Sequence, residues 1–282
     1  MLLGANGFVP RALRIRLKTG GIPHLVIGSN DVDLVDSASP ARLVAQLKAD
    51  DVLVMCAALT PEKGRDPATL AKNLRMAEHV ALALSRQRCA HIIYFSSDAV
   101  YGSAPSPISE ATPAAPSDLY GVMHLARELI MIQSAQTAGI PFCVLRPCAI
   151  YGAGDTHNSY GPNRFVRSAV ADRKIRIFGV GEETRDHVYI DDVTKLTLDI
   201  IARRSTGTLN LVSGQPTTFA ALAVEIGRIL QSEVPIEATA RTGEPTHRWF
   251  DESALRHAFP AHRSTTLSAG LTAMIASSTP AQ

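Results

Sequence analysis

Residues 1–10 read MLLGANGFVP, a pattern that predicts a short strand, a glycine turn and the start of a helix. Glycines let a backbone turn tightly and approach a ligand, and a helix N-terminus offers free N–H groups with a partial positive charge. A pyrophosphate suits such a turn, so we expect a dinucleotide there. Only three residues precede Gly4, so the first strand is either short or preceded by residues outside this sequence.

Strand-like and helix-like patterns alternate through the first two thirds of the chain. Strands are predicted at 23–27, 51–56, 91–95 and 141–145, and helices at 8–19, 39–48, 67–87 and 118–138. Short apolar strands separated by helices predict a parallel sheet that is covered on both faces. The predicted fold class is α/β, a doubly wound, Rossmann-like parallel sheet with ligands at the carboxyl ends of its strands.

After residue 152 the pattern changes to loops interrupted by glycine and proline, with one predicted helix at about 191–203 and another at about 217–231. We interpret 1–152 as a dinucleotide-binding domain and 153–282 mostly as a smaller C-terminal substrate-binding lobe. Residues 191–214 are expected to return to the first domain. The last dozen residues are rich in Ser, Thr, Ala and Pro and are predicted to be frayed.

Composition narrows the functional classes. The chain has 282 residues, 46% of them hydrophobic and 19% charged, with a net charge of +2. This charge indicates neither a nucleic acid nor an anionic membrane as a partner. Neither a membrane span nor a signal peptide is recognisable. Cys56, Cys89, Cys143 and Cys148 follow no metal-ligand spacing, so we expect reduced thiols in a cytoplasmic protein without a metal.

Several motifs follow in order along the chain. Residues 94–102 read YFSSDAVYG at a strand end, and residues 120–124 read YGVMH at a helix start, 23 residues after Ser97. RPCAIYG stands at 146–152, and RDHVYIDDV at 185–193 follows a GVG turn. This ordered set resembles the extended short-chain dehydrogenase/reductases, the NAD-dependent epimerase/dehydratase family that modifies nucleotide sugars. The resemblance runs from residue 4 to about residue 270.

The resemblance implies catalytic roles for Ser97 and Tyr120. The chemistry agrees, because a hydride leaves a sugar carbon only as the hydroxyl proton departs, and a base must accept that proton. The family carries a lysine four residues after the tyrosine, which holds the nicotinamide ribose and lowers the tyrosine pKa. Here that position is His124, which shares a helix face with Tyr120.

Histidine is a weaker source of charge than lysine. At its reference pKa of about 6.5, only about a quarter of the His124 imidazole would be charged at pH 7. We therefore expect slow hydride removal near neutrality and a faster reaction after His124→Lys.

The glycine turn and the resemblance together assign binding residues. The cofactor, NAD or NADP, is expected to contact Gly4, Asn6, Gly7, Phe8, Asp33, Leu34, Ala57, Ala58, Asn73, Tyr120, His124 and Pro147. The nucleotide-sugar substrate is expected to contact Ser97, Asp98, Asn163, Arg185 and Arg241, with Cys148, Ala149 and His187 lining the sugar pocket. Arginine suits a diphosphate because its planar fork donates two hydrogen bonds. The second strand is followed by Gly-Ser-Asn at 28–30, which does not choose between NAD and NADP.

The two residues after Ser97 indicate which reaction of the family the chain is expected to catalyse. Family dehydratases carry an Asp–Glu pair there, whereas this chain has Asp98 followed by Ala99, so elimination is disfavoured. Epimerisation needs only hydride removal, turnover of a transient keto-sugar and hydride return. An NAD(P)-dependent nucleotide-sugar epimerase therefore ranks first and a 4-keto-sugar reductase second.

A non-catalytic, dinucleotide-binding regulatory protein is the alternative from another class. It is favoured by Pro10 in place of the usual third glycine, by the short first strand and by His124. We also expect a homodimer formed through the helices at 67–87 and 118–138, because both are long and rich in Ala, Leu, Ile and Met.

Overall fold

The computed structural model describes residues 1–278, and the chain folds into two compact units. Unit 1 comprises Met1–Ala104, Glu110–Pro147 and Thr194–Asn210. Unit 2 comprises Pro105–Ser109, Cys148–Val193 and the chain from Leu211 onward. The predicted roles of a cofactor-binding domain and a substrate-binding lobe, with a boundary at residue 152, stay predictions.

A six-stranded sheet in the order β10-β5-β4-β3-β1-β2 forms the centre of unit 1. Its strands are β1 (Leu2–Leu3), β2 (Val26–Ile27), β3 (Val52–Met55), β4 (His91–Phe95), β5 (Phe142–Pro147) and β10 (Gly207–Leu211). The pairings of β1 with β2 and β3, of β3 with β4 and of β4 with β5 are parallel. The strand order reverses at β1, and in a doubly wound sheet such a reversal opens a ligand crevice at the carboxyl ends of the strands.

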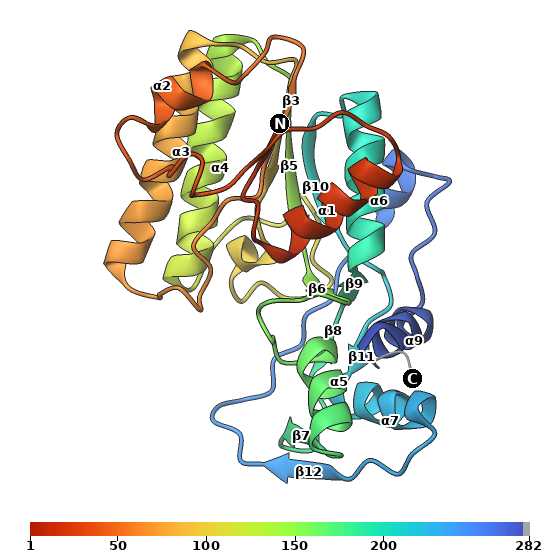
Figure 1. Ribbon diagram of the computed structural model, residues 1–282. Coiled ribbons are helices and arrows are strands. Elements are labelled where there is room, and N and C mark those ends of the chain that lie inside the picture. Colours follow the sequence, from red (N-terminus) through yellow and green to blue (C-terminus); the bar gives the residue numbers. More distant parts are fainter. Residues whose placement is uncertain (279–282) are drawn as a thin grey trace. The chain divides into compact units, whose positions relative to one another are not determined.

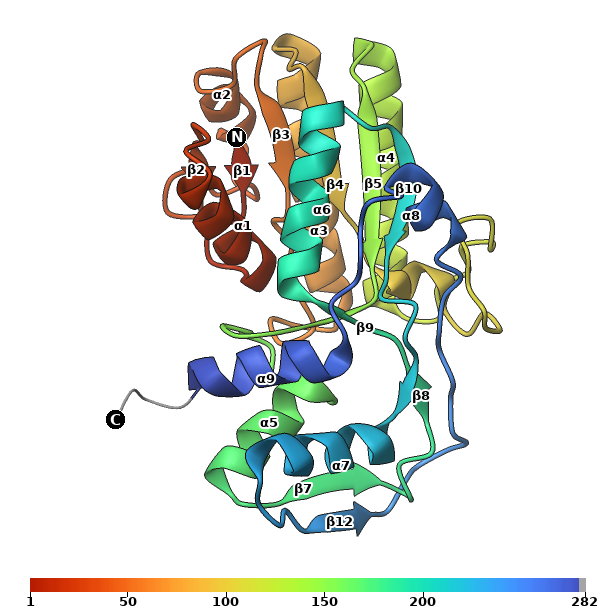
Figure 2. The same ribbon diagram turned by 90° about the vertical axis from the view of Figure 1, so that its right-hand side faces the viewer.

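Helices cover both faces of this sheet. They are α1 (Phe8–Thr19), α2 (Ser39–Val44), α3 (Pro67–Arg86), α4 (Leu119–Ala138) and α6 (Ile190–Arg203), with a short 3-10 helix η1 (Asp98–Tyr101). Helices α1 and α6 lie on one face, where Arg16 Nε donates to Thr194 Oγ1 at 2.7 Å, and α2, α3 and α4 lie on the other (Figure 2). Helices α3 and α4 run side by side (Figure 1). The predicted doubly wound α/β fold is confirmed.

Aspartate caps fix the starts of the two longest helices. The Asp66 carboxylate accepts a hydrogen bond from Thr69 N at 2.7 Å, and the Asp118 carboxylate accepts one from Gly121 N at 2.8 Å. Helix α4 ends at Gly139, whose φ of +61° is unstrained for glycine. The cap at Asp118 therefore places Tyr120 in the first turn of α4.

Unit 2 combines three two-stranded sheets with helices. The strands are β6 (Ala149–Tyr151), β7 (Ile175–Phe178), β8 (Thr184–Arg185), β9 (His187–Tyr189), β11 (Thr217–Thr218) and β12 (Ile236–Thr239), and the helices are α5 (Pro162–Ala171), α7 (Phe219–Leu230), α8 (Ser253–Ala258) and α9 (Leu267–Ser278). Strands β6 and β9, and β7 and β12, pair in parallel, and β8 pairs antiparallel with β11. Phe165, Leu222, Ile226 and Leu271 are fully buried in the core of this unit.

Two expectations for the C-terminal part were wrong. Helices α5, α8 and α9 stand where loops or frayed residues were predicted. Of the last dozen residues, 271–278 belong to α9, and Leu271, Met274 and Ile275 are buried at the i, i+3, i+4 spacing of an amphipathic helix. The Ser- and Thr-rich composition concealed that spacing. The remaining four residues lie outside the described part of the chain.

None of the helices in residues 1–278 combines the length and the apolar character needed to cross a membrane.

Candidate functional site

The glycine turn lies where the strand order reverses. Gly4 has a φ of +107°, and a Cβ at this position would lie 2.8 Å from Ala57 N, so only glycine lets the ends of β1 and β3 come this close. Gly7 caps α1 without a side chain, and the first turn of α1 carries no acidic residue. The N–H groups of this turn therefore face no competing carboxylate of their own helix, which suits a pyrophosphate. Asn6 is exposed and Phe8 is buried.

An acid that the sequence pattern did not reveal lies at the end of β2. Asp31 is exposed, and its Oδ2 accepts a hydrogen bond from Gly28 N at 2.9 Å, which brings a carboxylate back to the strand end. Asp31 directly follows the Gly-Ser-Asn at 28–30, and an aspartate that folds back in a turn is a recognisable signal in the sequence. Of the predicted adenine contacts, Asp33 is exposed and accepts from Val35 N at 3.0 Å, whereas Leu34 is buried in the unit 1 core.

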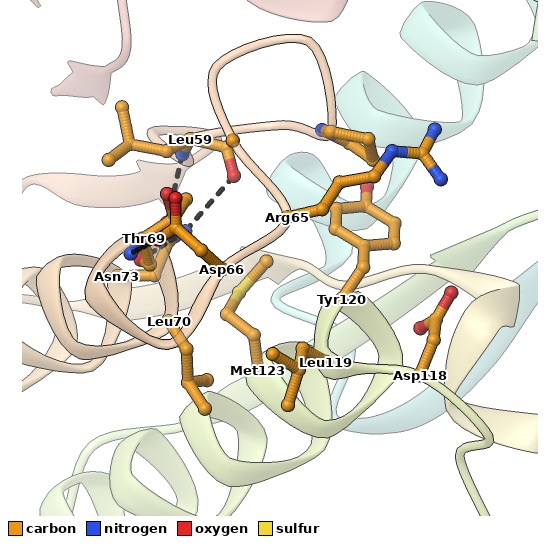
Figure 3. A pocket seen from close by; sticks show the side chains of 12 residues that line it. Leu59, Arg65, Asp66, Thr69, Leu70, Asn73, Asp118, Leu119, Tyr120 and Met123 are labelled. Atoms are coloured by element: carbon orange, nitrogen blue, oxygen red, sulfur yellow. Dashed lines mark hydrogen bonds between the residues drawn. The ribbon is translucent and has the colours of Figure 1, made fainter.

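Asn73 holds the loop that follows Ala57 and Ala58. Its side chain is 1% exposed, its Oδ1 accepts from Leu59 N at 2.8 Å, and its Nδ2 donates to Leu59 O at 3.0 Å (Figure 3). The amide is therefore occupied with the protein backbone. A direct contact between Asn73 and the cofactor stays a prediction.

Ser97 and Tyr120 are brought together by a close approach of α4 to η1. A Cβ at Gly121 would lie 2.4 Å from Ala99 O, so glycine at this position lets the start of α4 reach η1. Ser97 is the N-cap of η1, and its Oγ accepts from Ala99 N at 3.2 Å and donates to Asp98 Oδ1 at 3.3 Å. The hydroxyl that resembles the catalytic serine therefore lies beside the phenol that resembles the catalytic tyrosine.

The phenol of Tyr120 is held in its protonated form. Burial, followed by the Asp98 carboxylate, raises the pKa of Tyr120 to about 12, whereas a hydrogen-bonding contribution from Ser97 and the charge of Arg127 lower it. Tyr120 also lines a small hollow of unit 1 (Figure 3). The hollow is lined by Leu59, Pro61, Gly64, Arg65, Asp66, Thr69, Leu70, Asn73, Asp118, Leu119, Tyr120 and Met123.

His124 lies against Tyr120 but is neutral. Its ring is 3% exposed and stands edge-on to the Tyr120 ring with the centroids 4.7 Å apart, and its Nδ1 is hydrogen-bonded to the Tyr94 hydroxyl at 2.8 Å. Burial, followed by the charge of Arg127, holds the pKa of His124 well below its usual range. The expectation that a quarter of it is charged at pH 7 was therefore wrong, because the reference pKa ignored burial. Within residues 1–278, no group hydrogen-bonds the buried Nε2.

A second residue that the sequence pattern did not reveal is Arg127, one turn beyond His124. Its side chain is fully buried, its Nη2 donates to Ala57 O at 2.6 Å, and its Nη1 donates to Asn73 Oδ1 at 3.2 Å. A charged residue on the face of an otherwise apolar helix is the signal that could have found it. Arg127 thus connects the end of β3, helix α3 and helix α4.

Cys148, Ala149 and His187, the residues predicted to line the sugar pocket, belong to unit 2, where Ala149 at the start of β6 pairs with His187. Pro147 is the buried last residue of β5, and Cys148, also buried, donates its N–H to Leu211 O at 3.0 Å. Ala149 is exposed at the start of β6. His187 is buried in unit 2, where burial and then the charge of Arg185 lower its pKa to about 3. Their contacts with a sugar stay predictions.

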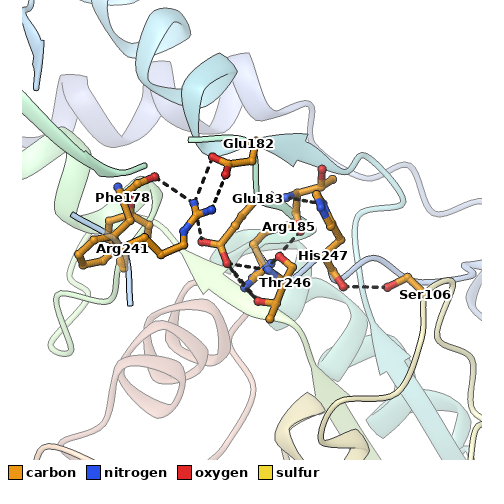
Figure 4. A network of polar contacts seen from close by, with 10 residues as sticks. Ser106, Phe178, Glu182, Glu183, Arg185, Arg241, Thr246 and His247 are labelled. Atoms are coloured by element: carbon orange, nitrogen blue, oxygen red, sulfur yellow. Dashed lines mark hydrogen bonds and ion pairs between the residues drawn. The ribbon is translucent and has the colours of Figure 1, made fainter. Parts of the chain in front are cut away.

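Arg185 and Arg241 lie together in unit 2 and share a carboxylate (Figure 4). Arg241 pairs with both Glu182 and Glu183, and Arg185 pairs with Glu183 at 3.5 Å. Arg185 Nη2 also donates to Thr246 Oγ1 at 2.6 Å. A diphosphate that binds both arginines therefore competes with two carboxylates. The third predicted residue, Asn163, is buried, and its side chain joins α5 to β6 by hydrogen bonds with Gly152 N and Ile150 O.

A hollow of about 450 Å³ in unit 2 has a basic and aromatic lining. Arg164, Arg167, Lys174 and Arg176 contribute positive charge, and Tyr160 and Phe178 contribute rings. Lys174 and Arg176 both pair with Glu237, so part of this charge is neutralised.

Known proteins resemble the chain over most of its length. The model of the NAD dependent epimerase/dehydratase family matches residues 1–211. A UDP-glucose 4-epimerase of Mycolicibacterium smegmatis is 27% identical over 225 residues, 68% of this chain and 70% of that protein. An uncharacterized UDP-glucose epimerase of Bacillus subtilis is 23% identical, with 98% of this chain and 89% of that protein covered. Among solved structures, RMD from Pseudomonas aeruginosa, complexed with NADPH, superimposes with a TM-score of 0.84 at 25% identity over 98% of this chain and 97% of that one.

The chain therefore belongs to the NAD dependent epimerase/dehydratase family.

Proposed function

We propose that the chain is an NAD-dependent nucleotide-sugar 4-epimerase that acts through a transient keto-sugar. The observation that carries this proposal is the proximity of the Ser97 hydroxyl to the Tyr120 phenol, which the close approach of Gly121 to Ala99 allows. Both residues lie in the unit that carries the glycine turn. Two curated relatives bear the names of UDP-glucose epimerases, which supports the substrate class.

The residues of this chain have distinct roles in the proposed reaction. A nicotinamide dinucleotide bound at the glycine turn would supply reversible hydride transfer. In its phenolate form, Tyr120 accepts the hydroxyl proton as the hydride leaves the sugar carbon, and it gives that proton back when the hydride returns. Ser97 hydrogen-bonds the same sugar oxygen. Arg185 and Arg241 bind the diphosphate in place of the carboxylates that they contact here.

The carboxylate at the end of β2 favours NAD. A 2′-phosphate near Asp31 would meet a like charge, whereas a ribose hydroxyl can donate to the free oxygen of the carboxylate. We therefore propose NAD as the cofactor of this chain.

Two other activities remain as alternatives. A 4-keto-sugar reductase would use the same serine and tyrosine. A non-catalytic, dinucleotide-binding protein is favoured by one observation, the neutral His124 beside a tyrosine whose pKa is raised to about 12. Ala99, where the family's dehydratases carry glutamate, makes elimination the least favoured reaction.

The test is to incubate the protein with NAD or NADP and a set of UDP-, dTDP-, GDP- and CDP-sugars and to follow the sugar protons by NMR. An epimerase gives the 4-epimer without net reduction of the dinucleotide, whereas a reductase oxidises added NAD(P)H in proportion to product. Tyr120→Phe should abolish the conversion and keep dinucleotide binding. Conversion that Tyr120→Phe leaves unchanged, or dinucleotide binding without conversion of any sugar, would overturn the proposal.

A further inference from the structure

Arg127 is a buried cation that forms no ion pair with a carboxylate of residues 1–278. Its guanidinium donates to the carbonyl of Ala57 and to the Asn73 amide oxygen, and it lies 5.3 Å from the centroid of the Tyr94 ring. In the described part of the chain, no carboxylate forms an ion pair with it, and its buried Nε has no hydrogen-bond partner. Burying a charge in this way costs free energy unless other interactions offset the cost.

The other buried arginine of this unit shows how such a charge is usually satisfied. Arg146 forms a bidentate ion pair with Glu128, with Nη2 and Oε2 2.6 Å apart. Glu128 directly follows Arg127 in the sequence, yet its carboxylate is turned to Arg146 and to the Ser96 hydroxyl. Helix α4 therefore keeps the charge of Arg127 unneutralised beside two tyrosines and a neutral histidine.

The position of Arg127 relates it to the tyrosine that we assign as the base. Arg127 lies three residues after His124 and seven after Tyr120, so the three side chains share one face of α4. Tyr94 connects His124 with Arg127, because its hydroxyl is hydrogen-bonded to His124 and its ring lies under the Arg127 guanidinium. The charge of Arg127 lowers the pKa of Tyr120, against the carboxylates of Asp98 and Glu62, which raise it together with burial.

We propose that Arg127 is the fixed positive charge of this site. It stabilises the phenolate of Tyr120 from within the protein, which is the electrostatic role that the family resemblance implies for a lysine at position 124. His124 is then a neutral positioning residue between Tyr94 and Tyr120. Arg127 touches neither substrate nor cofactor in this proposal and acts through Tyr120, so it is a positioning residue as well.

The buried charge of Arg127 gives a physical reason for a neutral histidine at position 124. A lysine at 124 would place two cations one turn apart in a buried cluster, where like charges disfavour each other. A neutral imidazole avoids that repulsion and keeps the hydrogen bond to Tyr94. One positive charge on this face of α4 is then enough to stabilise the phenolate. In this chain it lies on Arg127, one turn after position 124.

The proposal rests on the proposed function only in the assignment of Tyr120 as the base, and it can be tested without substrate or dinucleotide. 3,5-Difluorotyrosine, whose phenol is more acidic than that of tyrosine, is incorporated at position 120, and its ionisation is followed by ¹⁹F NMR against pH. Arg127→Gln, which keeps an N–H donor for Ala57 O, should raise the pKa of this phenol by about one unit, a tenfold loss of phenolate. Arg127→Lys should restore most of the wild-type value.

Two controls separate charge from structure. Arg88→Gln removes an arginine that donates to Gly139 O at the far end of α4 and should leave the titration unchanged. The double variant His124→Lys/Arg127→Gln restores one cation on the same face and should titrate like the wild type, which also serves if Arg127→Gln alone fails to fold. Equal titration of folded Arg127→Gln and wild type, or a double variant with a raised phenol pKa, would overturn the proposal. A shifted titration in a protein that converts no nucleotide sugar would instead count against the proposed function.

Discussion

The His124 ring stands edge-on to the Tyr120 ring at an interplanar angle of 88°, with its Nδ1 hydrogen-bonded to the Tyr94 hydroxyl. The imidazole therefore touches the expected base without offering it a charge. Arg127, one turn later and fully buried, is the cation of this cluster.

This arrangement changes what His124→Lys should do. A lysine so close to Arg127 is expected to lose its proton or to destabilise the fold by about 1–3 kcal/mol, because two buried cations repel and lack a carboxylate. We expect no gain in turnover from His124→Lys alone, and a rate within about threefold of the wild type from His124→Lys/Arg127→Gln. Urea unfolding and steady-state turnover of the two variants check this. A stable, faster His124→Lys protein would show that Arg127 does not oppose a second charge.

Gly121→Ala should damage the site more than the fold. The new Cβ would lie 2.4 Å from Ala99 O, so α4 must move away from η1 and carry Tyr120 away from Ser97. We expect a loss of about 1–3 kcal/mol in stability and a fall in kcat of about a hundredfold. The matched control is Gly227→Ala in α7, where the nearest atom is 3.6 Å away. Helix propensity predicts a gain of up to about 1 kcal/mol there. Equal turnover in wild type and Gly121→Ala would show that the close approach is not required.

The sequence predicted the elements that have strong local signals. Alternating apolar runs located the sheet, and the motif around Tyr120 located the start of α4, because both depend on residues close together in the chain. The missed features depend on burial or on distant partners. The apolar surroundings mark Arg127 as an unusual residue of α4, but its partners at the end of β3 and on α3 are distant in the sequence, as is Arg146, to which Glu128 turns. The occupation of Asn73 and Arg241 by protein partners is likewise invisible in the sequence.

Buried His187 should make unit 2 sensitive to acid. Burial, then the charge of Arg185, lowers the pKa of His187 to about 3, below its unfolded value of about 6.5. Between pH 6.5 and 3 the unfolded state binds a proton on this histidine and the folded state does not. The free energy of unfolding is therefore unaffected by His187 above pH 6.5 and falls as the pH is lowered toward 3. Each pH unit in this range should cost up to about 1.4 kcal/mol.

Fluorescence of Trp249, the single tryptophan, reports on unit 2 and can follow urea unfolding at pH 7.5, 6 and 5. His187→Phe should flatten the dependence on pH, whereas His257→Phe, at an exposed position, serves as the matched control. The same slope in His187→Phe and wild type would assign the acid sensitivity to other groups.

Arg241 should bind nucleotide sugar in competition with its own carboxylate partners. A charge-assisted contact with a diphosphate contributes roughly 1.5–3 kcal/mol, so Arg241→Ala should lower affinity at least about tenfold. Glu182→Gln should raise affinity, because it frees the guanidinium from one ion pair. Calorimetry with UDP-glucose measures both, and Arg228→Ala, which breaks an exposed pair with Glu225, is the control. Unchanged affinity in Arg241→Ala would remove this residue from the substrate site.

The faces of α3 and α4 that leave large apolar side chains exposed should form a homodimer interface. Leu129 is 60% exposed on α4 and Leu82 is 42% exposed on α3, and the two helices lie side by side (Figure 1). A second copy of the chain would bury these side chains, at roughly 25 cal/mol per Å² of apolar surface. We expect a dimer by light scattering at micromolar concentration and a monomer after Leu129→Glu, since a carboxylate cannot be buried there without a partner. Val224→Glu, on α7 with 63% exposure, is the matched control and should leave the mass unchanged. A wild-type monomer, or a Leu129→Glu protein that still dimerises, would show that these helices do not form the interface.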